Sequence, residues 1–392
     1  MPELFRKIVE NKAAKIEDPI ARLRFLQKTA GPVAGISQAA AAPGLPEDKR
    51  PRARWQVGVF AVVLVSMLLP GAKLSSSNDD PTPPSVPRAT DGGIDVFTNV
   101  WLVDKTKDFE TYSNGLRIDD RYTVSNEPRV FYPVYQRTAI NPKEPEWRSD
   151  PVGIVFHTTE SDQARFEEDQ TGQIKRIGQA VLAFVAKKHA YHFLIDRFGQ
   201  VFRVVQESDV ADHAGYSVWA DQNVIYVNLN SSFFGIAFET QTQKGQDLPS
   251  ANPAQIHAAR VLTQMLRNKY HIPAANCVTH AQVSVNPNNM LIGYHTDWSG
   301  NFPFHDIGLK DNYTAPPASI FAFGFDYDPS FVHATGVRIW QGLALAEDEM
   351  RAQAAAQGIP AQQYRIMLQK KYKEIIATLK AISAAKENSH AS

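Results

Sequence analysis

The stretch PVGIVFHTTES, residues 151–161, decides the fold of this chain. Its β-branched and aromatic residues from Val152 to Phe156 predict a strand, and a turn would normally follow. Instead the run ends in His157 and then in two threonines and two further polar residues. From this stretch alone, His157 is either a hydrogen-bonded core histidine or the ligand of a bound group.

Strand and helix patterns alternate on both sides of this stretch. Predicted strands cover residues 96–103, 129–136, 191–196, 200–205, 223–229, 234–240 and 277–280, and predicted helices cover residues 174–189 and 252–270. The second helix has Asn252 as its N-cap and Pro253 at its first position. This alternation predicts an α/β domain over residues 94–310, with a mixed central β-sheet flanked by helices.

The composition is that of a globular protein without net charge. Of the 392 residues, 43% are hydrophobic, and 41 Lys and Arg balance 41 Asp and Glu, so no charge excess indicates nucleic-acid binding. Cys277 is the only cysteine. It excludes an intramolecular disulfide and a cysteine-rich zinc site.

Residues 55–72, WQVGVFAVVLVSMLLPGA, predict a membrane anchor. This segment carries no charge over about the length that crosses a bilayer, and the basic KRPRAR precedes it. The flank predicts that residues 1–54 are cytoplasmic and that the rest lies in the periplasm or another extracytoplasmic space. A cleaved signal peptide and a buried helix are the alternatives, but the long N-terminal head favours an uncleaved anchor.

Two further segments complete the predicted organisation. Residues 73–93 are rich in Ser, Pro and Asp and predict a flexible linker. Residues 311–392 have mostly helical patterns and predict a C-terminal helical extension. This extension either packs on the α/β domain or forms a module that binds the cell wall or a partner.

Three residues form a candidate metal site. His157 and His280 each end an apolar strand run, and Asp297 lies in the loop GYHTDWSGNFPF. Two imidazoles and one carboxylate are a ligand set for catalytic Zn²⁺ that leaves a fourth position open. Their spacing follows no short metal motif, so the residues alone leave the core-histidine interpretation open.

Six motifs occur along the chain in the order GIVFHTTES, AYHFLIDRFGQVFRVV, ADHAGYS, NLNSSFFGIAFE, VTHAQ and DWSGNFPF. Together they resemble the zinc-dependent N-acetylmuramoyl-L-alanine amidases related to phage lysozyme amidases and peptidoglycan recognition proteins. The resemblance implies zinc ligands at His157, His280 and Asp297. It also implies hydrolysis of the amide between N-acetylmuramic acid and L-alanine in peptidoglycan. Four residues are expected at the substrate cleft: His213, Asn230, Tyr294 and Trp298.

The chain departs from the family at two catalytic positions. Ala237 stands where the family has its general-base glutamate, and Glu239 follows on the same face of the predicted strand. His295 replaces a lysine two positions before Asp297. We therefore expect Glu239 to transfer protons and His295 to stabilise the oxyanion.

The sequence as a whole predicts a membrane-anchored, extracytoplasmic zinc amidase that acts on peptidoglycan or muropeptides. The alternative is a non-catalytic peptidoglycan-binding module, which Ala237 favours and the intact ligand set disfavours. The predicted anchor disfavours an enzyme that recycles soluble muropeptides.

Overall fold

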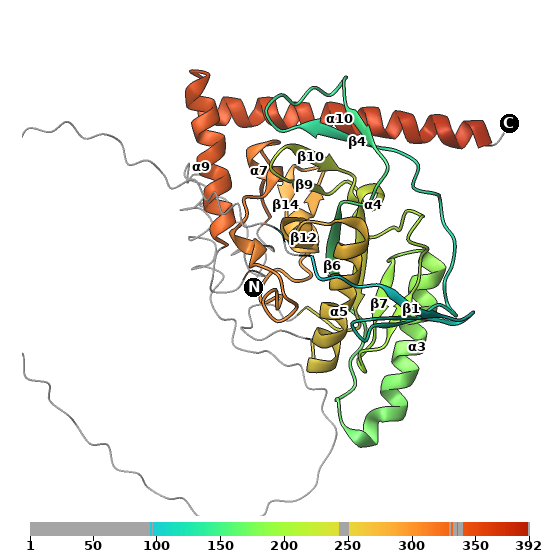
Figure 1. Ribbon diagram of the computed structural model, residues 1–392. Helices are drawn as coiled ribbons and strands as arrows, with labels where there is room; N and C mark the ends of the chain where they lie inside the picture. The colour runs from blue at the N-terminus through green and yellow to red at the C-terminus, as the bar shows by residue number, and fades with distance from the viewer. Residues whose placement is uncertain are drawn as a thin grey trace, which may run out of the picture. The chain divides into compact units, whose positions relative to one another are not determined.

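The computed structural model describes residues 95, 97–242, 251–328, 331, 335 and 340–390. A sheet with the strand order β1-β2-β3-β8-β7-β11-β6-β12 forms its centre (Figure 1). The decisive stretch forms β6 (Gly153–Thr158), which lies between β11 (Phe233–Phe238) and β12 (Cys277–Thr279) and is parallel to both. The other strands of this sheet are β1 (Leu102–Lys105), β2 (Phe109–Tyr112), β3 (Arg117–Asp119), β7 (Phe193–Ile195) and β8 (Val201–Arg203).

Two smaller sheets accompany the central one. One has the order β5-β4-β10-β9, and the other has the order β13-β14-β15. Their strands are β4 (Tyr132–Gln136), β5 (Glu146–Arg148), β9 (Val218–Ala220), β10 (Val224–Val227), β13 (Val285–Asn286), β14 (Leu291–Ile292) and β15 (Asp326–Tyr327). The mixed α/β architecture predicted from the sequence is confirmed.

Alternate residues of β6 face two different layers of the domain. Ile154 and Phe156 pack in a core cluster with residues of α5 (Pro253–Tyr270). Val155 packs in a second cluster with residues of β4 and β10. Since side chains along a strand alternate between its faces, His157 projects to the same side as Val155, away from α5.

Helices cover both faces of the central sheet. The N-cap predicted for α5 is confirmed, because the Asn252 side chain accepts a hydrogen bond from the backbone N of Gln255. On the opposite face, Leu182 and Val185 of α3 (Thr171–Lys188) pack in one cluster with Ala237 of β11. Four short helical segments connect these elements: η1 (Glu168–Gln170), α4 (Leu229–Ser232), η2 (Ala274–Asn276) and α6 (His280–Val283).

The C-terminal extension is helical and shares a core with the α/β domain. It contains η3 (Asn312–Thr314), α7 (Ala318–Phe321), α9 (Gln341–Ala356) and α10 (Ala361–His390). Residues of α9 and α10 belong to one core cluster with Ile225 of β10 and Ala281 of α6. Figure 1 shows α10 running past β4 and β10. The packed arrangement is therefore the one found, and a role in wall or partner binding stays a prediction.

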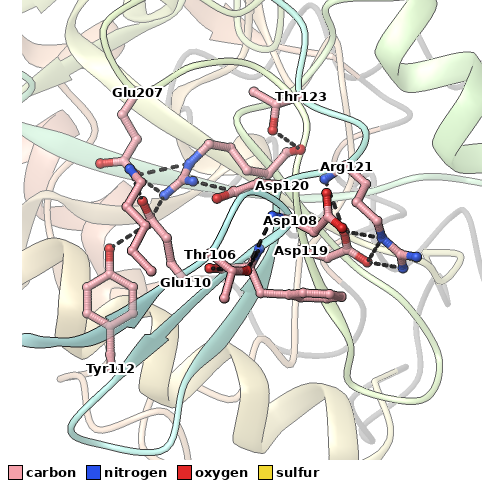
Figure 2. A network of polar contacts seen from close by, with 12 residues as sticks. Thr106, Asp108, Glu110, Tyr112, Asp119, Asp120, Arg121, Thr123 and Glu207 are labelled. Atoms are coloured by element: carbon pink, nitrogen blue, oxygen red, sulfur yellow. Dashed lines mark hydrogen bonds and ion pairs between the residues drawn. The ribbon is translucent and has the colours of Figure 1, made fainter.

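An ion-pair network ties β2 and the segment after β3 to β8. Arg203 of β8 is buried, and its guanidinium contacts the carboxylates of Glu110, Asp120 and Glu207. Figure 2 shows these three acidic side chains gathered around one guanidinium. A buried arginine is stabilised only when its charge is paired in this way, so the network fixes the N-terminal strands to the central sheet.

The predicted cytoplasmic segment, anchor and linker, residues 1–54, 55–72 and 73–93, lie outside the described residues. Within the described part of the chain, no helix has both the length and the apolar character needed to cross a bilayer.

Candidate metal centre and active site

The three predicted ligands converge at the carboxyl ends of β6 and β12. His157 lies in β6, His280 is the first residue of α6, directly after β12, and Asp297 lies in the loop that follows β14. The Asp297 carboxylate lies 3.2 Å from Nδ1 of His157 and 2.9 Å from Nδ1 of His280. One ligand atom from each residue lies within 4.8 Å of the other two. All three residues are buried.

This donor set fits a catalytic zinc site. Two imidazole nitrogens and one carboxylate oxygen are the usual protein ligands where a fourth position serves water or substrate. Burial lowers the pKa of His157 to about 4, so the imidazole is neutral at pH 7 and can bind a metal. Although burial alone would raise it, the neighbouring His280 and His157 hold the pKa of Asp297 well below its usual range.

A chain of hydrogen bonds orients the imidazole of His157. Nε2 of His213 lies 3.2 Å from the carbonyl O of Phe233, which can only accept, so Nε2 carries the proton. Nδ1 of His213 then accepts from Nε2 of His157 at 3.1 Å. This tautomer leaves the lone pair of His157 on Nδ1, the atom beside Asp297. Gly235 makes room for this arrangement, because a Cβ there would lie 2.6 Å from Cγ of His213.

The three ligands open into a cavity of about 610 Å³. Four other sequence-predicted site residues line it: His213, Asn230, Tyr294 and His295. Asn230 builds the adjacent turn, because its Oδ1 accepts from the backbone N of His213, Ala214 and Gly215. The structure therefore gives Asn230 a structural contact besides its place in the cavity wall.

His295 and Tyr294 form one side of this cavity. The His295 ring stacks on His280 with ring centroids 4.6 Å apart, and burial lowers the pKa of His295. Tyr294 is 61% exposed and packs edge-on against His295. Tyr294 is thus available to a ligand at the cavity rim, while His295 lies next to the metal ligands.

Trp298 does not line the cavity, contrary to the sequence prediction. Its side chain is only 3% exposed and belongs to the core cluster on the α5 side of the central sheet. The Trp298 ring packs edge-on against Phe238 and Phe302. Burying this large apolar ring in the core is more favourable in free energy than exposing it at the cleft.

Glu239 also lies apart from the metal ligands. Ala237 packs against residues of α3, and the Glu239 carboxylate lies beside Gly178 of the same helix, so both residues face α3 as predicted. However, Glu239 lines a separate cavity of about 520 Å³ between α3 and the β7–β8 hairpin, which shares no lining residue with the metal cavity. Its Oε2 accepts from the backbone N of Arg197, and its Oε1 is buried without a hydrogen-bond partner. An ideal Cβ on Gly178 would lie 3.0 Å from Oε2, so this glycine leaves room for the carboxylate.

We expect the melting temperature of the Glu239→Gln variant to rise relative to that of the wild type as the pH increases from 5 to 8. Burial raises the pKa of Glu239 from 4.5 to about 7. The folded wild type therefore holds a proton that the unfolded chain has lost, and its stability falls between these two pKa values. Glutamine mimics the protonated form and removes this loss.

The melting temperatures of both proteins at pH 5 and pH 8 measure the effect. A difference of about 1 kcal/mol in the free energy of unfolding corresponds to a difference of roughly 2–4 °C in melting temperature. The exposed Glu167→Gln variant is the control. Parallel pH profiles for wild type and Glu239→Gln would show that Glu239 is not a buried acid.

The structure adds Tyr191 and Glu160 to the cavity wall. The Tyr191 ring centroid lies 5.0 Å from that of His157. Its sequence neighbour His192 does not line the cavity. His192 is fully buried, accepts from the backbone N of Gly235 and donates to the carbonyl O of Asp209, so its role is structural. Glu160 belongs to the stretch quoted first, three residues after His157.

A family model matches the part of the chain that contains this site. Residues 147–297 match the family model described as N-acetylmuramoyl-L-alanine amidase. Among solved structures, the N-acetylmuramoyl-L-alanine amidase LysC from Clostridium intestinale URNW is 23% identical, with 47% of this chain and 93% of that chain covered and a TM-score of 0.26. No curated protein matches the chain.

Two further solved structures contain bound muropeptides. AmiD from E. coli, in complex with anhydro-N-acetylmuramic acid-L-Ala-D-gamma-Glu-L-Lys, is 18% identical, covers 63% of this chain and 98% of its own, and has a TM-score of 0.33. AMPDH3 from Pseudomonas aeruginosa, in complex with anhydromuramic pentapeptide, is 19% identical, with coverages of 58% and 90% and a TM-score of 0.31. The family match spans His157, His280 and Asp297. Residues 147–297 thus form a domain of the N-acetylmuramoyl-L-alanine amidase family, and this domain makes the protein an amidase.

Proposed function

We propose that this amidase is zinc-dependent and hydrolyses the amide bond between the lactyl group of N-acetylmuramic acid and L-alanine in peptidoglycan. The observation that carries the proposal is the convergence of His157, His280 and Asp297, all buried, in one cavity of the family domain. Such a site has the ligand number and ligand types of a catalytic zinc centre.

The residues of the site have two kinds of role, which are to hold the metal and to contact the substrate. His157, His280 and Asp297 would hold the ion, and His213 keeps His157 in the tautomer that leaves Nδ1 free. Zinc supplies Lewis acidity, which makes water a stronger nucleophile at neutral pH and polarises a carbonyl group. His295, stacked on His280, is placed to donate a hydrogen bond to the carbonyl oxygen as it gains negative charge.

We also propose that residues 55–72 anchor the enzyme with its amidase domain outside the cytoplasm. The uncharged segment and its basic flank support this orientation. Protease added to intact spheroplasts should remove the amidase domain; a domain that becomes sensitive only after lysis would contradict the proposed topology.

The second candidate function is non-catalytic peptidoglycan binding. Two observations favour it: Ala237 replaces the family's glutamate, and Glu239 lies outside the metal cavity. The full-length protein in detergent therefore needs a joint measurement of zinc content by mass spectrometry and of peptide release from sacculi.

We expect about one zinc per chain and release of stem peptides that begin at L-alanine, with loss of release after chelation and recovery with added zinc. Binding of zinc and sacculi without any peptide release would favour the binding module. A zinc-free protein that binds no added zinc would show that His157 is a hydrogen-bonded core histidine and not a metal ligand.

A further inference from the structure

The metal cavity needs a proton carrier that neither Ala237 nor Glu239 supplies. Hydrolysis of an amide requires a group that removes a proton from water and delivers it to the leaving nitrogen. Among the described residues, three carboxylates line the cavity: Glu160, Asp212 and Asp297. Asp297 is committed to the two histidines, so Glu160 and Asp212 remain.

The electrostatic surroundings distinguish these two acids. After burial, the charges that most affect the pKa of Asp212 come from His189 and Glu127, neither of which lines the metal cavity. Glu160 instead acts on Tyr191: after burial, the charges of Asp297 and Glu160 raise the pKa of Tyr191. Tyr191 packs against the ligand His157. Glu160 also lies three residues after His157, just beyond the end of β6, and lines the cavity together with His157 and Tyr191. Its position and its charge both link Glu160 to the metal end of the cavity.

The backbone holds Glu160 in a fixed position. Its φ of 51° lies in the left-handed region, which a non-glycine residue adopts at an energetic cost. The backbone N of Thr159 donates to the carbonyl O of Phe238 at 2.9 Å, and that of Glu160 donates to Thr240 at 3.0 Å. These bonds extend the β6–β11 pairing beyond both strands, so the loop is attached to the central sheet.

The Glu160 carboxylate is anchored through one of its two oxygens. Oε1 accepts from Oγ1 of Thr158, from the backbone N of Thr242 at 2.8 Å and from Oγ1 of Thr242. All the hydrogen bonds that described residues donate to this carboxylate go to Oε1. Oε2 accepts none of these hydrogen bonds, and Glu160 is exposed and lines the cavity.

We propose that Glu160 is the proton carrier of this amidase and replaces the glutamate that the family has at the position of Ala237. The inference rests on the proposed hydrolysis. Oε2 accepts a proton from water as the water oxygen bonds to the carbonyl carbon. Glu160 then gives this proton to the amide nitrogen as the C–N bond breaks, which leaves the lactyl carboxyl group and the free amine of L-alanine.

The test compares Glu160→Gln with the control Glu167→Gln in the full-length protein. Glu167 is exposed, lies outside the metal cavity and carries the same substitution seven residues along the chain. We expect Glu160→Gln to keep its zinc and its melting temperature and to lose peptide release roughly 100-fold or more. We expect Glu167→Gln to match the wild type in all three measurements.

A second variant, Glu160→Gly, guards against misfolding and tests the chemistry directly. Glycine adopts the observed φ of 51° without strain and leaves space for a small carboxylate. Added formate should restore part of the lost activity of Glu160→Gly, and it should not restore that of Glu160→Gln. A merely structural role of Glu160 gives no such rescue.

The outcomes separate this inference from the proposed function. A wild type that binds zinc and releases no peptide contradicts the proposed hydrolysis itself. An active wild type beside a zinc-loaded Glu160→Gln variant within about threefold of its activity overturns the role of Glu160 alone, because loss of a general base costs far more. Absence of formate rescue in a folded, zinc-loaded Glu160→Gly variant also counts against it.

Discussion

The Asp297→Ala variant should lose both stoichiometric zinc and peptide release. Asp297 supplies the only carboxylate of the three-residue site and lies between the two imidazoles. Its removal leaves two neutral ligands, fewer than a catalytic zinc site uses. We expect zinc affinity to fall by more than the roughly 10–100-fold that follows loss of a residue supporting a ligand, and activity to fall with it.

Competition with a calibrated chelator measures the zinc affinity, and the sacculus assay measures activity on the same samples. Asp306→Ala is the matched control, because Asp306 is exposed and lies nine residues along the chain, outside the cavity. Circular dichroism of the metal-free proteins checks that Asp297→Ala still folds. A folded Asp297→Ala variant with undiminished zinc affinity would show that the metal is held elsewhere.

The meeting of His157 and His280 was predictable from local patterns, whereas Asp297 was assigned through the family resemblance. His157 and His280 end apolar runs, and strands that are parallel neighbours bring such ends to one edge of a sheet. The capped start of α5 was equally local, since Asn252 and Pro253 define it within a few residues. Patterns of this kind depend only on the spacing of residues along one element.

The residues that were misplaced depend on contacts between distant segments. Period-two alternation correctly put Glu239 on the face of Ala237, but the space below Gly178 of α3 decides which cavity receives the carboxylate. Trp298 follows a metal ligand in sequence, yet Phe238 of a remote strand buries its ring. Tyr191 and His192 are neighbours, and only the tertiary structure shows which of the two lines the cavity.

The Glu347→Ala variant should lower the free energy of unfolding by about 3–5 kcal/mol, the usual result of removing one partner of a buried ion pair. Glu347 of α9 is fully buried and Arg365 of α10 is 4% exposed. The guanidinium of Arg365 binds both carboxylate oxygens of Glu347, at 2.8 and 2.7 Å. Tyr327 of β15 also donates to Glu347, so the substitution leaves a buried charge and a buried hydroxyl without their partner.

Chemical denaturation of Glu347→Ala beside Glu374→Ala measures the loss, since Glu374 is an exposed glutamate of α10. The double variant Glu347→Leu with Arg365→Met should recover much of the stability, because replacing both partners of a buried pair by apolar residues is often neutral.

The shape of the denaturant unfolding curve tests whether the extension supports the metal centre. α9 and α10 share a core cluster with β10 and α6, the helix that begins at the ligand His280. One cooperative transition, with zinc affinity lost at the same denaturant concentration, would show that the extension supports the metal centre. A separate early transition that leaves zinc bound would show that the extension folds independently of it.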